Sequence, residues 1–256
     1  MITSTSNAQV KALSKLIKNA RARRQQQVYI VEGIRMFRET PEDRIEKIYA
    51  SESFVKEHET LLAGKDWEML SDSVFASVSD TKTPQGVLCL VKMRENRLED
   101  MLQQKNGLWL ILENVQDPGN LGTIFRTAEA AGATGILLSS DSVDVYNPKV
   151  IRSTMGAVFR MPFFYVKDLP AAVKSLSGQG IRTYAAHLNG KNVYDEEDYT
   201  EGCAFLIGNE GNGLRDEVSE CADCLIRIPM CGKAESLNAA VAAAVLMFEA
   251  GRQRRK

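Results

Sequence analysis

The sequence lacks the features that mark several large classes of protein. It contains no apolar run near the roughly 20 residues of a membrane-spanning helix, and its N-terminus has no secretory apolar core. Its five cysteines are odd in number and scattered, which speaks against a disulfide framework and fits a reducing cytosol. We therefore expect a cytoplasmic protein. The acid-free, Ser- and Arg-containing N-terminus leaves a mitochondrial transit segment as the alternative.

Charge of one sign is also missing, since 32 Lys and Arg residues face 33 Asp and Glu residues. A net charge of −1 does not by itself indicate nucleic-acid binding. The contents of 44% hydrophobic and 25% charged residues are typical of a soluble globular protein. The 256 residues suffice for one large or two ordinary domains.

The charges are nevertheless unevenly distributed. Residues 1–31 contain no Asp or Glu but six basic residues, and such a cluster can grip phosphates on a neutral protein. The alternative interpretation is that these basic residues form the solvent-exposed face of a helix and bind nothing. For the C-terminal "RQRRK" a disordered tail is the favoured interpretation. The candidate RNA-contacting residues are Lys11, Lys15, Lys18, Arg21, Arg23 and Arg24.

The chain divides into two patterns of elements. Residues 1–93 predict a small α/β unit, in which residues 6–24 have apolar side chains at helical spacing and "VYIVEG" is strand-like. Residues 94–106 are polar and charged and are predicted to form the linker. From residue 107 to 256, strands and helices alternate, which predicts a mainly parallel sheet covered on both faces.

The predicted second domain has regular helix starts. Asn147-Pro148 provides a cap and a first-turn proline, Asp168 is a candidate cap, and a last helix is expected from about Ser236 to Arg252. Its six expected strands are residues 108–112, 135–139, 162–166, 181–188, 203–208 and 224–229.

Three loops of this domain combine polar and turn-forming residues at strand ends. They are "ENVQDPGNLG" after "LWLIL", "IGNEGNGL" at residues 207–214, and "IPMCGKAESLNAA" at residues 228–240. Each, taken singly, has a structural explanation as a turn or a helix cap. Because parallel sheets bind ligands at the carboxyl ends of their strands, the three loops together predict one pocket. The first loop is neither a G-x-x-x-x-G-K-[ST] nor a G-x-G-x-x-G phosphate loop.

The three loops, in this order, resemble the motifs of the SpoU (TrmH) family of RNA ribose methyltransferases. The first runs from Asn114 through Asp117-Pro118, Asn120 and Gly122 to Arg126 and Ala128; the second is Gly208-Asn209-Glu210-Gly211-x-Gly213-Leu214. The third is Ile228-Pro229-Met230-x-Gly232 followed by Ser236-Leu237-Asn238, and residues 147–163 resemble the family's intermediate segment. The match covers about 150 residues with every motif residue present.

The resemblance implies an α/β domain with a deep C-terminal trefoil knot, which binds S-adenosylmethionine and works as a homodimer. It implies no metal. The alanine-rich helix "LNAAVAAAVLMFEA" has small side chains suited to close packing in a knot or a dimer. By motif matching, the cofactor contacts, made largely through backbone groups, are Gly208, Ile228, Met230 and Leu237.

Family resemblance makes Arg126 the catalytic arginine. Arginine is ordinarily protonated, so it either takes the 2′-hydroxyl proton with help from the RNA phosphate, or stays cationic, clamps the phosphate and stabilises the alkoxide. Asn120 is expected to orient Arg126 or the ribose, and Glu210 to position Arg126 or balance its charge. Ser236 and Asn238 are expected to bind the substrate phosphate or the arginine, with a helix cap as the alternative for Ser236.

The first half is similar to a small RNA-binding domain shared with large-subunit ribosomal proteins, on "NAQVKALSKL" and "VYIVEGIRMF". The sequence therefore predicts methylation of a ribose 2′-hydroxyl in RNA, with 23S rRNA as the preferred substrate and tRNA as the alternative. A noncatalytic RNA-binding assembly factor and a nucleotide-dependent enzyme on an open sheet are the competing classes.

A C-x-x-C pair, Cys221 and Cys224, resembles half of a zinc site. Zinc sites need four well-placed ligands, and there is no second such pair. The only two histidines, His58 and His187, are distant in sequence from the pair. We interpret the cysteines as buried free thiols and His187, at the end of a strand, as structural.

Overall fold

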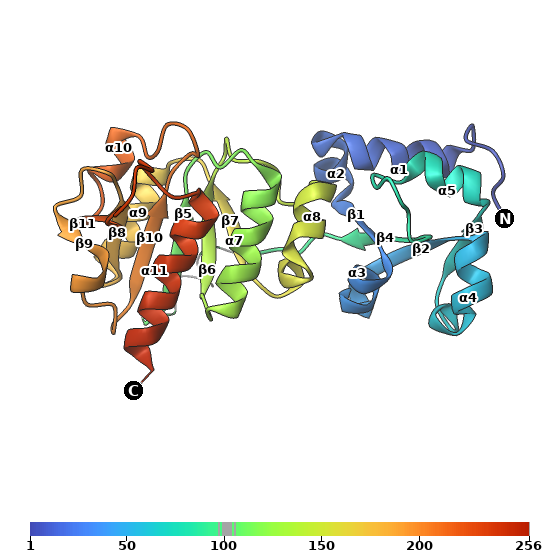
Figure 1. Ribbon diagram of the computed structural model, residues 1–256. Coiled ribbons are helices and arrows are strands. Elements are labelled where there is room, and N and C mark those ends of the chain that lie inside the picture. The colour runs from blue at the N-terminus through green and yellow to red at the C-terminus, as the bar shows by residue number, and fades with distance from the viewer. Residues whose placement is uncertain (97, 99–103, 105, 256) are drawn as a thin grey trace. The chain divides into compact units, whose positions relative to one another are not determined.

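The computed structural model describes residues 1–96, 98, 104 and 106–255. The chain forms two compact units (Figure 1). The first unit comprises Met1–Glu95 and Asp144–Phe159, and the second comprises Asn96–Val143 and Arg160–Lys256. The sequence predicted two consecutive domains, whereas Asp144–Phe159, from the middle of the chain, groups with the first unit. The predicted linker at residues 94–106 lies largely outside the described residues.

The first unit is built on a mixed four-stranded sheet in the order β1-β4-β2-β3. β4 is antiparallel to both neighbours, and β3 is parallel to β2. The short strand β3 was not predicted, because its residues are only half-buried except at its end. The strands are β1 (Val28–Glu32), β2 (Ile45–Ser51), β3 (Trp67–Leu70) and β4 (Val87–Lys92).

Two helices replace the single one predicted over residues 6–24. Asn19 has an extended backbone (φ −129°), and its side chain accepts a hydrogen bond from the N–H of Ala22 at 3.1 Å, so it begins a new helix. The helices of this unit are α1 (Ala8–Lys18), α2 (Ala20–Gln26), α3 (Ile34–Glu39), α4 (Glu52–Leu62), α5 (Asp72–Val78) and α8 (Pro148–Thr154).

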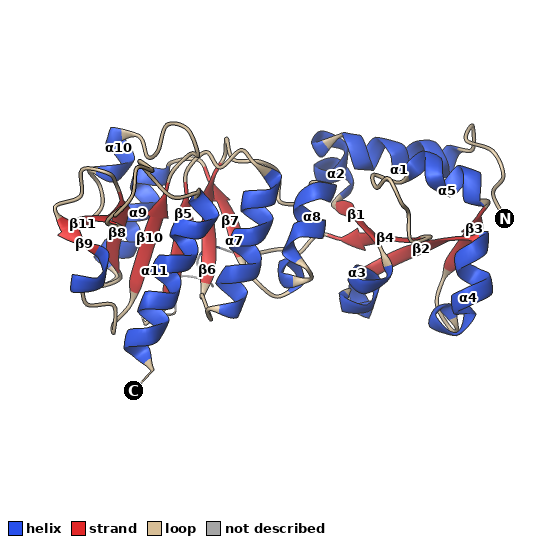
Figure 2. Cartoon of the chain, viewed as in Figure 1, coloured by secondary structure: helices blue, strands red, loops and turns tan. Residues whose placement is uncertain are grey.

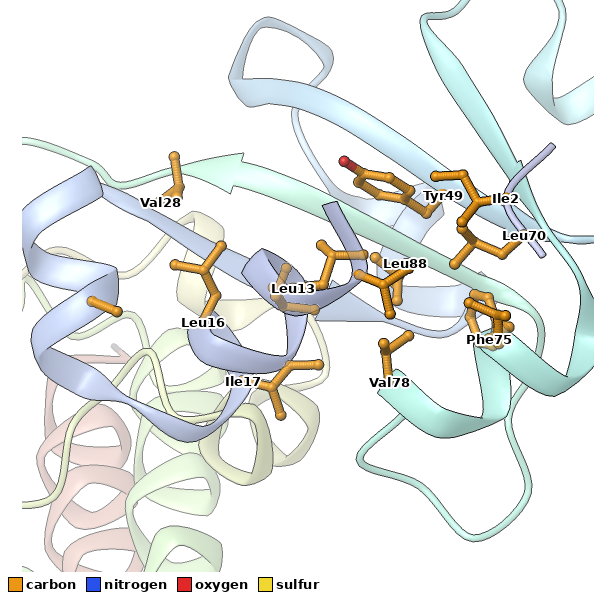
Figure 3. Close-up of a cluster of buried hydrophobic side chains, with 14 residues drawn as sticks. Ile2, Leu13, Leu16, Ile17, Val28, Tyr49, Leu70, Phe75, Val78 and Leu88 are labelled. Carbon is orange, nitrogen blue, oxygen red and sulfur yellow. The ribbon is translucent and has the colours of Figure 1, made fainter. Parts of the chain in front are cut away.

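The core of the first unit lies between α1, α5 and the sheet (Figure 3). Leu13, Leu16 and Ile17 of α1 belong to the same buried cluster as Phe75 of α5 and Leu88 of β4. The lysines Lys11, Lys15 and Lys18 lie on the exposed side of α1. Burial of the apolar stripe therefore fixes the direction in which the basic residues face.

The segment Asp144–Phe159 is held to this unit by polar and aromatic contacts. Asp144 pairs with Arg23, whose Nε donates to Oδ2 at 3.1 Å. The ring of Tyr146 packs against that of Tyr29, with centroids 4.5 Å apart and planes tilted by 38°. Arg152 donates to Asp80 at 2.9 Å. α8 starts at the predicted Asn147-Pro148, with Asn147 as its cap.

Arg23 was predicted to face RNA, and this prediction is wrong. The residue is 3% exposed, and its Nη1 donates to the carbonyls of Leu16 and Ile17 at 2.7 and 3.1 Å. Together with the bonds to Asp144, these contacts occupy the guanidinium inside the unit. A buried cation needs such partners, and the spacing of basic residues along a helix does not reveal which of them is buried.

Replacing Arg23 with alanine is expected to destabilise the protein by about 3 kcal/mol, because the nearly buried Asp144 carboxylate would lose its cation. Urea unfolding measures the loss. The control is Arg24→Ala, which removes the same charge from the exposed next position and should cost no more than about 0.5 kcal/mol. Equal effects of the two variants would contradict the structural role of Arg23.

The second unit contains a seven-stranded sheet in the order β7-β6-β5-β10-β8-β11-β9 (Figure 2). Every neighbouring pair of strands is parallel, which confirms the predicted sheet type. The two-residue edge strand β9 was not predicted. The strands are β5 (Leu108–Leu112), β6 (Gly135–Ser139), β7 (Phe163–Val166), β8 (Arg182–Ala186), β9 (Asn192–Val193), β10 (Cys203–Ile207) and β11 (Cys224–Arg227).

Helices cover both faces of this sheet, as predicted. α7 (Pro118–Ala130) packs beside α11 (Ala239–Arg254) on one face. α9 (Leu169–Gly178) and α10 (Asp216–Ser219) share a buried cluster with Trp109 and Ile111 of β5 on the other. Because side chains alternate along a strand, the intervening leucines of β5 face α7 and α11. All five residues of β5 are accordingly buried.

Two helix starts in this unit test the predicted caps. Asp168 caps α9 by accepting from the N–H of Ala171 at 2.9 Å, as predicted. α11 begins at Ala239 rather than near Ser236, because Asn238 is the cap and accepts from the N–H of Ala240 at 2.9 Å.

Among the described residues, no helix has the length and apolar character to cross a bilayer.

Candidate active site

A pocket of about 870 Å³ lies at the carboxyl ends of β8, β10 and β11 and at the N-terminus of α11. Its walls include Gly208, Ile228, Met230 and Leu237, the four residues for which the sequence predicted cofactor contacts. The second and third motif loops therefore meet at one edge of the sheet, where parallel sheets hold their ligands.

The loop after β10 approaches itself so closely that position 208 admits no side chain. A Cβ on Gly208 would lie 2.1 Å from the carbonyl carbon of Gly213 and 2.2 Å from the nitrogen of Leu214. Asn209 and Gly213 exchange backbone hydrogen bonds of 3.0 and 2.9 Å, and Gly213 has φ +70°. The glycines at 208 and 213 thus allow a tight turn whose backbone forms part of the pocket wall.

The first motif loop is fastened to this turn. The side-chain amide of Asn209 donates to the carbonyl of Asn114 at 2.8 Å. Glu210 accepts from the N–H groups of Gln116 and Asp117 at 3.3 and 3.2 Å. The loops after β5 and β10, adjacent strands in the sheet, therefore form one hydrogen-bonded layer.

Asn120 connects all three motif loops. Its Nδ2 donates to Oε1 of Glu210 at 3.0 Å, and its Oδ1 accepts from Nδ2 of Asn238 at 2.9 Å. Asn238 in turn caps α11. Both ends of the Asn120 amide are thus engaged, which joins the start of α7, the Gly208 turn and the start of α11.

The Glu210 carboxylate is stabilised by its donors. Burial raises its pKa, but the Asn120 amide and the N–H groups of Gln116 and Asp117 outweigh that effect and hold the pKa below its usual range. A depressed folded-state pKa stabilises the fold above the unfolded value of about 4.3, and this contribution is lost as the pH falls through the folded value.

The difference in unfolding midpoint between the wild type and Glu210→Gln should therefore stay constant from neutral pH to about pH 5. It should shrink below about pH 4, where protonation removes the wild-type advantage. Thermal unfolding across this range measures it. A difference as large at about pH 3 as at neutral pH would show that the ionised carboxylate is not the stabilising form.

Arg126 lies on α7, exposed to solvent. It makes no hydrogen bond or ion pair with any residue that the structure describes, so neither Asn120 nor Glu210 holds it here. It is also not among the pocket-lining residues. Its guanidinium is consequently available for a group from outside the chain.

An ion pair next to the site, between the buried carboxylate of Glu113 and the exposed side chain of Arg215, was missed. Glu113, 1% exposed at the end of β5, accepts from the backbone N–H of Arg215 at 2.8 Å and from its Nε. This pair anchors the end of the Gly208 turn to β5. The signal was a charged residue directly after the apolar run "LWLIL", because a buried charge requires a partner.

Two further residues line the pocket. Ser236 is exposed there and does not cap α11, so the alternative interpretation as a cap is wrong. His187, interpreted from sequence as structural, also reaches the wall; its Nδ1 accepts from the N–H of Asn189 at 3.1 Å. No sequence pattern linked His187 to the motif loops.

The cysteines form no site. All five are free, but only Cys89 and Cys203 are buried. Cys221 and Cys224 are half-buried and Cys231 is exposed, so the interpretation as buried thiols is wrong for these three. Burial raises the pKa of the Cys224 thiol, which disfavours a reactive thiolate. No group of His, Cys, Asp or Glu suited to hold a metal ion occurs within the described part of the chain.

Comparison with known families adds to this geometry. Residues 107–248 match the model of the SpoU rRNA methylase family, over more than half of the chain. The chain belongs to the SpoU family. Residues 7–89 match an MRM3-like substrate-binding domain, so the SpoU motifs and the front domain are recognised separately. The family predicted from the three motifs is confirmed.

Individual relatives match this chain over 96% of its length or more. A Bacillus subtilis protein described as a 23S rRNA (guanosine(2553)-2′-O)-methyltransferase is 34% identical, covering 96% of this chain and 97% of its own. The AdoMet-bound rRNA methyltransferase of Sinorhizobium meliloti superposes with a TM-score of 0.87 at 30% identity, covering 100% and 98%. The SpoU methyltransferase AviRb of Streptomyces viridochromogenes, in complex with AdoMet, gives 0.85 at 25% identity, covering 97% and 98%.

Proposed function

We propose that this chain transfers a methyl group from S-adenosylmethionine to a ribose 2′-hydroxyl of 23S rRNA. The observation that carries the proposal is the convergence of the three SpoU motif loops, joined through Asn120, beside one pocket. The names of the relatives support the reaction and the RNA, and the AdoMet complexes support the cofactor.

The pocket fits the cofactor. Its volume of about 870 Å³ is within the range of small-molecule sites, and its walls combine apolar residues and glycines with polar side chains. Gly208 leaves room for a close backbone approach, and Ile228, Met230 and Leu237 supply apolar surface. When bound, S-adenosylmethionine supplies a methyl group already activated by its sulfonium, so the chain needs only to align and deprotonate the acceptor.

We propose that Arg126 acts on the ribose 2′-hydroxyl, the group that accepts the methyl. Transfer of the methyl group to the 2′-oxygen would break the carbon–sulfur bond, would leave its electrons on sulfur, and would require the hydroxyl proton to leave. Arg126 either takes that proton with the help of the RNA phosphate, or clamps the phosphate and stabilises the alkoxide as a cation. Asn120, Glu210 and Asn238 position the three motif loops relative to one another. Ser236 is exposed in the pocket wall, where it can contact the substrate.

The first unit is proposed to bind the RNA, in keeping with its match to a substrate-binding domain. The helical candidates that remain after Arg23 is excluded are exposed and make no ion pair among the described residues. They are Lys11, Lys15, Lys18, Arg21 and Arg24.

We also propose that the second unit contains a trefoil knot and that the protein is cytoplasmic.

We propose that the chain forms a homodimer through α11. Val241 and Phe248 of α11 are 48% and 46% exposed, and they lie seven residues apart on one side of the helix. Phe248→Glu should convert the dimer to monomers in sedimentation experiments, because it places a charge in the interface. The control is Lys174→Ala on α9, on the other face of the sheet. A dimer retained by Phe248→Glu would remove α11 from the interface.

The function is tested by tritium transfer from labelled S-adenosylmethionine to rRNA and tRNA, followed by mapping of ribose methylation in a deletion strain. We expect one 23S rRNA mark to be lost and to be restored by the purified chain. Loss of a methylation mark from tRNA would instead identify tRNA as the substrate. The absence of methyl transfer to either RNA would favour a noncatalytic assembly factor.

A further inference from the structure

The loop of residues 79–86 in the first unit is held in place by a buried carboxylate. Glu32, at the end of β1, is only 7% exposed. It accepts from the hydroxyls of Ser79 and Thr81, the latter at 2.8 Å, and from the N–H of Asp80 at 3.1 Å. Because a buried charge is costly unless it is hydrogen-bonded, these contacts fix the first half of the loop.

The second half of the loop is equally constrained. Oε1 of Gln85 accepts from the N–H of Ile34 at 2.9 Å, which ties the loop to the start of α3. Gly86 has φ +79°, and a Cβ there would lie 2.6 Å from Oγ of Ser51 and 2.7 Å from Cβ of Phe54. Both ends of an exposed loop are therefore ordered, which lowers the entropy cost of binding a ligand.

A pocket of about 410 Å³ lies against this loop. Phe54, Phe75 and Ala76 give it apolar walls, and its polar groups include two carboxylates. The polar lining residues are Ser51, Ser53, Glu57, Asp72 and Gln85. Asp72 accepts from the N–H of Ser53 at 3.0 Å and from its hydroxyl at 2.7 Å, and these bonds hold its pKa below the usual range. The pocket thus combines an apolar wall with an ionised hydrogen-bond acceptor.

Two unpaired positive charges lie close in sequence to residues of the pocket and its loop. Lys82 precedes the lining residue Pro84 by two positions, and Arg35 follows Ile34, the residue bound by Gln85. Both are exposed, and neither makes a hydrogen bond or ion pair with another described residue. Asp80, the single acidic residue of the loop, is neutralised by Arg152 at 2.9 Å.

We propose that this pocket receives an unstacked nucleobase of the RNA substrate, while Lys82 and Arg35 contact the phosphates beside it. Proteins read RNA mainly at single-stranded loops, whose splayed bases enter pockets with apolar or aromatic walls. Asp72 accepts a hydrogen bond from a donor on the edge of the base, either an exocyclic amino group or a ring N–H. The inference rests on the proposed function, because it takes RNA as the substrate.

The test fills the pocket and removes the charges separately. Ala76→Phe places a ring in the pocket from an exposed position of α5, so the fold should be retained and a thermal unfolding midpoint checks this. Lys82→Ala removes one of the two cations. The matched control is Lys92→Ala, an exposed lysine at the other end of β4, about 17 Å along the strand from Val87.

Affinities are measured with short transcripts that tile the 23S rRNA and with fully paired duplexes of the same sequences. Ala76→Phe should weaken binding of the preferred transcript at least about 5-fold, the contribution of one stacked base, and leave duplex binding unchanged. Lys82→Ala should lower the slope of log affinity against log salt by about 1, whereas Lys92→Ala should not.

Wild-type affinity of Ala76→Phe for the preferred transcript, or an equal loss on transcript and duplex, would overturn the inference. Methyl transfer by the same samples separates this failure from failure of the proposed function. A chain that methylates RNA while Ala76→Phe keeps the wild-type KM for RNA refutes only the nucleobase pocket. A wild-type chain that methylates no RNA refutes the function.

Discussion

Arg126→Ala is expected to lower the rate of methyl transfer by roughly 1000-fold or more, the loss seen when a group that stabilises transition-state charge is removed. Cofactor affinity should not change, because Arg126 does not line the pocket. Stability should change by less than about 0.5 kcal/mol, because the side chain is exposed and bonded to no described residue. Single-turnover transfer, cofactor titration and urea unfolding measure the three quantities.

Lys174→Ala provides the charge control, since it removes an exposed cation from α9 on the opposite face of the sheet. It should retain wild-type transfer. Full methylation by Arg126→Ala would refute both roles assigned to the arginine, the assisted base and the cationic clamp. A loss of cofactor binding in that variant would instead place Arg126 in the pocket wall.

Gly208→Ala is expected to weaken cofactor binding by roughly 10- to 100-fold, because one methyl group must displace the backbone of the turn. The nearest obstacles, the carbonyl of Gly213 and the nitrogen of Leu214, are main-chain atoms that cannot rotate away. Shifting them breaks the paired hydrogen bonds between Asn209 and Gly213 and moves the pocket wall.

Gly211→Ala is the matched control in the same turn. A Cβ at that position meets only Oδ1 of Asn209, at 3.5 Å, which is an ordinary contact. Calorimetric titration with S-adenosylmethionine should therefore show a small change for Gly211→Ala and a large one for Gly208→Ala. Equal affinities for the two variants would mean that the close approach at position 208 does not shape the site.

The sequence was informative where short-range rules decide the outcome. The alternation of predicted strands and helices predicted the parallel sheet, because the helix between two strands returns the chain to the same end of the sheet. Asp168 and Asn147 were recognised as caps because a cap is a local hydrogen bond. The order of three motif loops identified the family and the four residues that now line one pocket.

The sequence did not predict which side chains from distant segments form ion pairs or hydrogen bonds with one another. Arg23 and Lys18 are both basic residues of the N-terminal helices, yet one is buried against Asp144, 121 residues later, and the other is exposed. Glu210 was expected beside Arg126, but its carboxylate is engaged by Asn120 and by the N–H groups of two neighbours. Each outcome depends on which strands and loops become neighbours in the folded sheet.

From the amino-acid order alone came the family, the class of sheet and the loops that carry the chemistry, since these follow from periodicity and closely spaced motifs. Only the folded chain decided that Asp144–Phe159 joins the first unit and that Asn120 bridges Glu210 and Asn238. The physical reason is that burial and hydrogen bonding are satisfied between segments far apart in sequence, and no local pattern states which donor meets which acceptor.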